Sequence, residues 1–271
     1  MYSSINLIGY FFRKLVYSVH MLKEIKKITL NSENLTANAL FFIPEKISGT
    51  RCCLFTHGYT SHKGSILTWA QKMMDLNIPT IIFDLPGHFL GGFHDVPSFE
   101  LFKKEGPLLF SEAFTTIKKE FPEIVTAISG GHSLGALFSL LHSAQSDFIQ
   151  HQICVGLGSL PLNKPHLFET PFFKDTMLLR SELVSKQLSP TQVLPWIAET
   201  KRKAITSDKN IHLIGGSDDI IIGGTEGVEQ MAGYLMPSNQ VIKHIIPKLP
   251  HHLPENAGVF VKKIVQQIIN E

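Results

Sequence analysis

The stretch from Thr126 to Leu141, TAISGGHSLGALFSLL, limits the possible folds of this 271-residue chain more than any other. The stretch begins within an apolar run, residues 124–128, whose length and β-branched content predict a buried strand. A segment rich in leucine and alanine follows and predicts a helix. Gly131 and Gly135 flank Ser133 at a spacing that relieves crowding in a sharp strand-to-helix turn. The pattern therefore predicts that Ser133 projects from the sheet edge at a helix N-terminus, where backbone amides favour negative charge.

The rest of the chain alternates apolar strands with amphipathic helices. A turn at residues 31–34 joins the first two strands into an antiparallel hairpin. The alternation that follows predicts one α/β domain over residues 1–271, with a mostly parallel central sheet and helices on both faces. Apart from the strand and helix around Ser133, the predicted strands are 23–30, 35–43, 52–56, 80–83, 153–157, 211–214 and 241–246, and the predicted helices are 66–76, 107–120, 225–235 and 257–269.

Two segments depart from this rhythm. Residues 1–22 place apolar side chains at helical spacing, and the positive charges follow the apolar run, unlike those of a secretory signal. This helical segment is too short to span a bilayer, and we expect it to pack on the domain; peripheral contact with a membrane or a partner is the alternative. Residues 159–203 form an insertion interrupted by prolines, in which Ser189-Pro190 predicts the start of a helix. Its large apolar residues are Phe168, Phe172, Phe173, Met177, Leu178, Leu179, Leu183, Trp196 and Ile197.

Composition excludes several classes of protein. The chain carries 25 basic and 23 acidic side chains without a long basic tract, so nothing favours nucleic-acid binding. Three cysteines, including adjacent Cys52 and Cys53 in an apolar strand, suit buried thiols in a reducing, cytoplasmic setting. No group of residues has metal-ligand spacing, and Gly215-Gly216 lacks the third glycine of a dinucleotide site. We expect neither metal nor cofactor.

Polar residues gather where strands of the predicted sheet end. Ser133, residues 215–219, residues 250–252 and His57-Gly58-Tyr59 each follow a strand. A serine hydroxyl becomes a nucleophile when a histidine takes its proton and a carboxylate orients that histidine. An oxyanion hole supplies two amide donors, which we assign to the backbone N–H groups of Tyr59 and Leu134. His57 is expected to bond loop backbone, and Asp84 to organise a loop.

These features resemble the α/β-hydrolase superfamily. Ser133, Asp218 and His251 follow its serine–acid–histidine order, and the G-H-S-L-G turn, the early H-G pair and the D-x-x-G-H stretch at residues 84–88 match its pattern. Within the superfamily, His57-Gly58-Tyr59-Thr60 with Lys63 looks like a stretch of small carboxylesterases and feruloyl-esterase-like enzymes. The resemblance covers nearly the whole chain and implies that the insertion at 159–203 is a helical lid.

Two assignments have a competitor one residue away. The superfamily's G-x-x-D-x-[IV]-[IV] pattern selects Asp218 when counted from Gly215, and counting from Gly216 would select Asp219. We expect Asp218 to be the acid. Pro250 stands where the superfamily usually has glycine before its histidine. We expect His251 to be the base, with His252 as the alternative.

The resulting hypothesis is a serine hydrolase that cleaves carboxylic esters through an acyl-enzyme. The apolar residues of the insertion would line a pocket over Ser133 and favour small to medium apolar acyl groups or aromatic groups. A thioesterase, a monoacylglycerol lipase or a carbon–carbon bond hydrolase could use the same fold and triad. A non-catalytic binding protein is the alternative outside enzymes, and the intact serine, acid and histidine argue against it.

Overall fold

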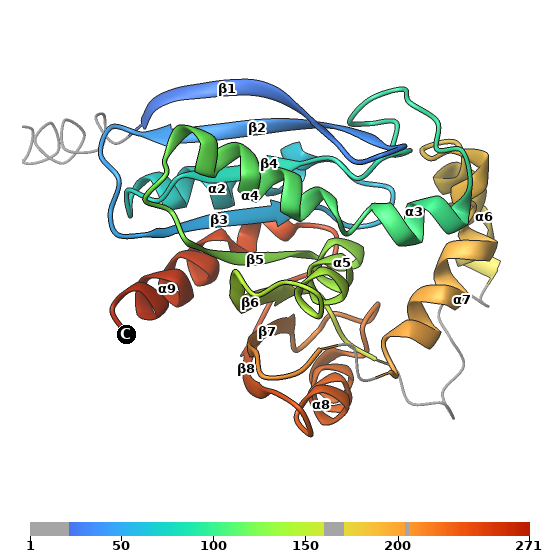
Figure 1. The fold of residues 1–271 in the computed structure, drawn as a ribbon. Helices are drawn as coiled ribbons and strands as arrows, with labels where there is room; N and C mark the ends of the chain where they lie inside the picture. The colour runs from blue at the N-terminus through green and yellow to red at the C-terminus, as the bar shows by residue number, and fades with distance from the viewer. Residues whose placement is uncertain (1–21, 160–170, 204–205) are drawn as a thin grey trace, which may run out of the picture.

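The fold is described from a computed structural model that covers residues 22–159, 171–203 and 206–271. The predicted N-terminal helical segment therefore lies outside the described residues, apart from Leu22. An eight-stranded sheet forms the centre of the molecule, in the order β1-β2-β4-β3-β5-β6-β7-β8 (Figure 1). Its strands are β1 (Leu22–Asn31), β2 (Thr36–Pro44), β3 (Arg51–Thr56), β4 (Thr80–Phe83), β5 (Thr126–His132), β6 (Ile149–Val155), β7 (Asn210–Gly216) and β8 (Gln240–Ile246).

The sheet has an antiparallel edge and a parallel body. Strand β2 runs antiparallel to both β1 and β4, whereas every neighbouring pair from β4 across to β8 is parallel. The carboxyl ends of the parallel strands therefore meet at one edge, where loops from β3, β5 and β7 come together. The predicted hairpin and the mostly parallel sheet are both confirmed.

Helices cover both faces of the sheet and enclose two cores. Successive side chains of a strand point to opposite faces of the sheet, so a buried strand contributes side chains to both cores. In β3, Cys52 and Leu54 belong to the first core, and Cys53 and Phe55 belong to the second. Burial raises the pKa of these thiols, which are free, as expected for small buried hydrophobes. Helices α2 (Leu67–Met74) and α9 (Gly258–Ile269) bury residues in the second core, and helices α4 (Leu109–Glu120), α5 (Leu134–Ser143) and α8 (Gly224–Leu235) in the first.

Several elements differ from the predicted ones at their ends. Strand β6 begins four residues earlier than predicted, at Ile149, and β7 continues to Gly216. Helix α3 (Phe99–Glu105) was not predicted; the Ser98 hydroxyl caps it by accepting a hydrogen bond from the Leu101 amide at 3.1 Å, and Phe102 is buried. None of the helices within the described residues is long and apolar enough to cross a membrane.

The described part of the insertion stands at the carboxyl edge of the parallel strands (Figure 1). It contains α6 (Pro171–Ser181), the short 3-10 helix η3 (Lys186–Leu188) and α7 (Pro190–Thr200), which begins at the predicted Pro190. Backbone hydrogen bonds join it to the loop after β4: the Phe89 amide donates to Leu183, and the Ser185 amide donates to Gly87, each at 2.9 Å. The insertion is thus anchored on the body by its middle.

Candidate active site

Ser133 occupies a strained turn between β5 and α5. Its φ of 50° and ψ of −108° lie outside the regions that a residue with a side chain normally adopts. A Cβ on Gly131 would lie 2.5 Å from the carbonyl oxygen of Thr56, and a Cβ on Gly135 would lie 2.5 Å from those of Thr56 and His57. The two glycines therefore allow the turn to pack against the end of β3, which adds a second reason for the G-x-S-x-G spacing.

The carboxylate that contacts His251 belongs to Asp219. Asp219 Oδ2 lies 2.9 Å from His251 Nδ1, and Oδ1 accepts hydrogen bonds from the Ile221 amide at 3.0 Å and the Ile222 amide at 3.4 Å. The Asp219 side chain is only 2% exposed, as expected for a carboxylate whose oxygens are all engaged.

The predicted register of the acid was wrong by one residue. Asp218 lines the same cavity but is exposed, and the structure gives it no contact with His251. Strand β7 continues to Gly216, where a Cβ would lie 2.1 Å from the Leu249 carbonyl oxygen, and the turn begins after it. The count from Gly216, which selects Asp219, is therefore the one that agrees with the contact to His251.

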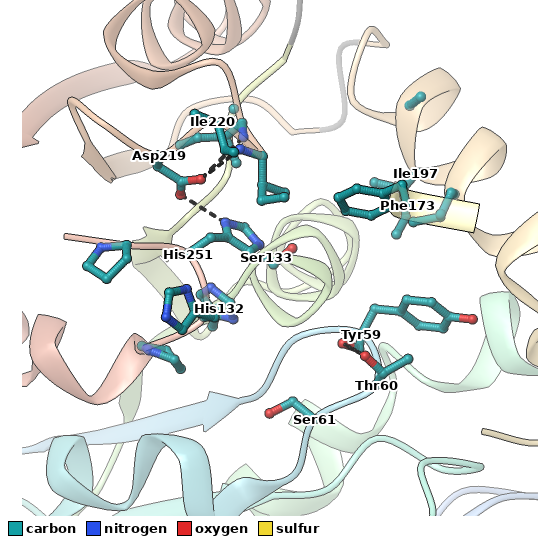
Figure 2. A pocket seen from close by; sticks show the side chains of 18 of the residues that line it. Tyr59, Thr60, Ser61, His132, Ser133, Phe173, Ile197, Asp219, Ile220 and His251 are labelled. Atoms are coloured by element: carbon teal, nitrogen blue, oxygen red, sulfur yellow. Dashed lines mark hydrogen bonds and ion pairs between the residues drawn. The ribbon is translucent and has the colours of Figure 1, made fainter. Parts of the chain in front are cut away.

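His251 lies between the carboxylate and the serine, and Figure 2 shows its ring beside Ser133. Since Nδ1 faces Asp219, Nε2 is the ring nitrogen left for a reacting group. Helix α2 fixes the chain that follows His251: the Trp69 indole donates to the Pro254 carbonyl at 2.8 Å, and the Thr68 hydroxyl donates to the Glu255 carbonyl at 3.0 Å. The exposed His252 lines the cavity, and the structure gives it no contact with a carboxylate.

The loop after β3 runs directly beside the turn that carries Ser133. A Cβ on Gly58 would lie 2.6 Å from His132 Nδ1 and 3.3 Å from Ser133 Cβ, so only glycine allows this approach. Tyr59 follows on the cavity wall, and Leu134 is the first residue of α5, whose amide has no acceptor within the helix. The two backbone groups expected to form an oxyanion hole thus come from different elements, the loop after β3 and the first turn of α5.

The side chains of His57 and Asp84 hold this loop in place through hydrogen bonds. His57 Nδ1 donates to the Gly58 carbonyl at 2.8 Å, and its Nε2 accepts from the Leu85 amide at 2.9 Å. Burial lowers the pKa of His57 to about 3, so it stays neutral. Asp84 accepts hydrogen bonds from both the backbone amide and the ammonium of Lys63. The expected roles of His57 and Asp84 as loop organisers are confirmed.

Hydrogen bonds also join this loop to the insertion, a feature that was not predicted. The Tyr59 hydroxyl donates to the Leu188 carbonyl at 2.5 Å, and Arg180 Nη1 donates to the Thr60 hydroxyl. Thr60 has a φ of 59°, so the loop is strained where these contacts hold it. No sequence pattern could have revealed the first contact, because its acceptor is a backbone carbonyl 129 positions away.

A cavity of about 750 Å³ lies over Ser133 and His251. Phe173, Met177 and Ile197 of the insertion line it, as predicted, together with the loop 220–222. Trp196 instead packs on Phe99 and Phe138. Leu178 and Leu179 point to solvent and are each 71% exposed. The predicted lining residues Phe168 and Phe172 have side chains outside the described part of the chain.

Two further histidines near the turn are packed in the interior. His132 is buried with its ring centroid 4.6 Å from that of His251, and burial holds its pKa well below the ordinary value. His142 Nε2 lies within hydrogen-bond distance of the Ser111 and Ser146 hydroxyls. Within residues 22–159, 171–203 and 206–271, no three His, Cys, Asp or Glu side chains could jointly hold a metal ion.

Comparison with known proteins shows similarity in structure. No protein-family model matches the sequence, and no curated protein matches it either. Among solved structures, the chain is similar to a thermostable carboxyl esterase from Bacillus coagulans, with 15% identity and a TM-score of 0.66 over 92% of this chain and 98% of that one. The Pyrococcus furiosus esterase Pf2001 shares 16% identity over 91% of each chain, with a TM-score of 0.60.

Lipases are also among the solved structures to which the chain is similar. A putative lipase from Acinetobacter baumannii shares 14% identity over 100% of this chain and 98% of that one, with a TM-score of 0.62. At these identities the similarity establishes the fold. The chain has the α/β-hydrolase fold that the sequence predicted.

Proposed function

We propose that this protein is a serine hydrolase that cleaves carboxylic esters through an acyl-enzyme. The observation that carries the proposal is the buried contact between Asp219 and His251 in the cavity that contains Ser133. Structures of similar fold include esterases and lipases, which supports ester hydrolysis as the reaction.

The proposed mechanism begins at His251. Asp219 holds the proton of His251 on Nδ1 and stabilises the imidazolium, so that Nε2 can accept the proton of the Ser133 hydroxyl. Ser133 Oγ then attacks the ester carbonyl carbon. The amides of Tyr59 and Leu134 donate to the oxyanion, and the dipole of α5 adds positive potential at the same place.

Collapse of the tetrahedral intermediate breaks the bond to the alcohol. His251 returns its proton to the leaving alkoxide oxygen, and the acyl group remains on Ser133. A water molecule then loses a proton to His251 and attacks the acyl-enzyme, which releases the carboxylic acid and restores the Ser133 hydroxyl. The cycle balances without a redox partner.

The cavity supports small to medium substrates with apolar parts. Its volume of about 750 Å³ falls in the usual range for small-molecule sites, and Phe173, Met177 and Ile197 provide apolar contact. An ester panel that varies acyl length at constant leaving group would measure this selectivity. A thioester, a monoacylglycerol and a ketone with a cleavable carbon–carbon bond belong in the same panel, because the triad does not distinguish them.

A fluorophosphonate probe tests the proposal directly. We expect one adduct per chain, mapped by peptide mass spectrometry to Ser133, and loss of that adduct in both Ser133→Ala and His251→Ala. Circular dichroism would show that the variants fold. A folded wild-type protein without an adduct on Ser133 would overturn the proposal, as would labelling that is unchanged in His251→Ala.

A further inference from the structure

Three cationic side chains of the insertion line the cavity over Ser133. Arg180 comes from α6, and Lys201 and Arg202 follow directly after α7. Among the residues that the structure describes, none of the three forms an ion pair with a carboxylate. The neighbouring Lys203 differs, because it does not line the cavity and pairs with Glu199 at 2.8 Å.

Lys201 and Arg180 are half-buried in a mainly apolar wall and only partly hydrogen-bonded, whereas Arg202 is exposed. Lys201 Nζ donates one hydrogen bond, to the Gly158 carbonyl at 2.8 Å, although an ammonium has three donors. Burial lowers the pKa of Lys201 to about 8, which still leaves most of it protonated at pH 7. Arg180 Nη1 contacts Thr60, and its buried Nε has no acceptor within the described chain. Taking charged donors out of water without full compensation costs free energy.

The carboxylates on the cavity wall do not balance this charge. Asp219 attracts Lys201 through space, but its oxygens are engaged by His251 and two backbone amides. Asp218 also lines the cavity, so the wall carries two carboxylates against three cations. The cavity therefore combines apolar walls with excess positive charge, and an amphipathic anion matches both properties.

We propose that the preferred substrates are esters whose acyl group carries an anionic end, a carboxylate or a phosphate, beyond an apolar spacer, and that Lys201 and Arg202 bind this anion. The inference rests on the proposed ester hydrolysis at Ser133. Phe173, Met177 and Ile197 would contact the spacer. An anion on the acyl group stays bound through both acylation and deacylation, so its binding energy can assist both steps.

A series of 4-nitrophenyl esters tests the charge preference. The mono-4-nitrophenyl ester of adipic acid is anionic, its methyl-capped form is neutral, and the ester of 6-aminohexanoic acid is cationic. We expect kcat/KM to be about tenfold or more higher for the anionic ester than for the neutral one, because a hydrogen bond to a charged group contributes roughly tenfold or more in affinity. The cationic ester should be the poorest substrate.

Variants assign the preference to the named residues. Arg202→Met, at an exposed position, and Lys201→Met should each lower kcat/KM for the anionic ester about tenfold more than kcat/KM for the neutral ester. Lys203→Met is the matched control and should change neither. If Lys201→Met does not fold, Arg202→Met alone decides, since the Arg202 side chain is exposed and forms no hydrogen bond or ion pair within the described chain.

Binding separates this inference from the proposed function. Titration calorimetry on Ser133→Ala with adipate or inorganic phosphate should show binding that weakens in Arg202→Met, and the tighter of the two anions identifies the recognised group. Equal kcat/KM for anionic and neutral esters, with no binding of either anion, would overturn the inference even if Ser133 hydrolyses esters. Anion binding without any adduct on Ser133 would overturn the proposed function and retain the anion site.

Discussion

The turn that carries Ser133 and the inserted helices face each other across one cavity, but different forces hold them in place. The turn rests on backbone: the Ser133 amide donates to the Val155 carbonyl at 2.8 Å, and two glycines allow contact with β3. The insertion has backbone hydrogen bonds to the loop after β4, but its contacts with the loop after β3 are made through the side chains of Tyr59 and Arg180, and it exposes Leu178 and Leu179. We infer that the proposed reaction depends mainly on the turn and that substrate selectivity depends mainly on the insertion.

The largest expected effect tests Asp219 as the proposed catalytic acid. Asp219→Asn should lower kcat about 10⁴-fold, because an amide no longer stabilises the imidazolium or fixes the histidine tautomer. Asp218→Asn is the matched control and should change kcat less than about twofold. Ester hydrolysis by both variants measures this, and a reversed order would contradict the assignment made from the contact with His251.

A substitution at Gly135 tests how closely the turn that carries Ser133 packs against the end of β3. Gly135→Ala would place a Cβ 2.5 Å from two backbone carbonyl oxygens, so we expect a loss of unfolding free energy of about 3 kcal/mol or no folded protein. Gly233→Ala in α8 is the control, since a Cβ there meets nothing within 4 Å and should be neutral or stabilising. Urea unfolding of the two variants would decide.

Acid should destabilise the body of the protein through its buried histidines. Burial lowers the pKa of His57 and His88 to about 3, below the value of about 6.5 expected in the unfolded chain. The unfolded state therefore binds more protons below pH 6.5, and the stability that these groups contribute at neutral pH is lost as pH falls toward 3. At pH 5 the loss is about 2 kcal/mol per histidine.

Urea unfolding at pH 7.5 and pH 5 measures this loss. His88→Gln should reduce the dependence of stability on pH, because it removes one of the buried histidines whose pKa is lowered. An unfolding free energy that stays constant between these pH values would show that the two histidines titrate normally in the folded protein.

The hydrogen bond between Tyr59 and Leu188, which joins the two regions, predicts a smaller effect, on kcat. Tyr59→Phe removes the hydrogen bond to Leu188 and leaves the backbone amide of residue 59 in the chain. We expect kcat to fall about tenfold with little change in KM, because a less ordered amide stabilises the oxyanion less well. Tyr234→Phe on α8 is a control at a tyrosine that does not line the cavity. An unchanged kcat in Tyr59→Phe would show that the loop holds its geometry without the insertion.

The smallest effect is expected on the outer surface of the insertion. Leu178→Ser and Leu179→Ser should change stability by less than about 0.5 kcal/mol, because both side chains are already in water. Their kcat/KM for soluble esters should match that of the wild type. Met177→Ser, one position away on the cavity wall, should by contrast weaken turnover of esters with long acyl groups.

The amino-acid sequence by itself determined the parts of this protein that depend on local pattern. Alternating strands and helices predicted the sheet, and two glycines at fixed spacing predicted the turn at Ser133, because these features follow from backbone sterics and burial along a short segment. The assignment of His251 came from the resemblance to the α/β-hydrolase superfamily, and the structure places its Nδ1 2.9 Å from Asp219 Oδ2. Helix α3 escaped this reasoning, although Ser98 and the buried Phe102 provided a local signal.

Only the tertiary structure decided which neighbouring residue faces the site. Asp218 and Asp219 are chemically identical, and the choice between them depends on where β7 ends against Leu249. The contacts of Tyr59 with Leu188 and of Arg180 with Thr60 join positions more than a hundred residues apart. The cluster of Arg180, Lys201 and Arg202 also exists only once α6 and α7 pack over the sheet. The direction in which a side chain points is set by three-dimensional packing, and local sequence carries no record of it.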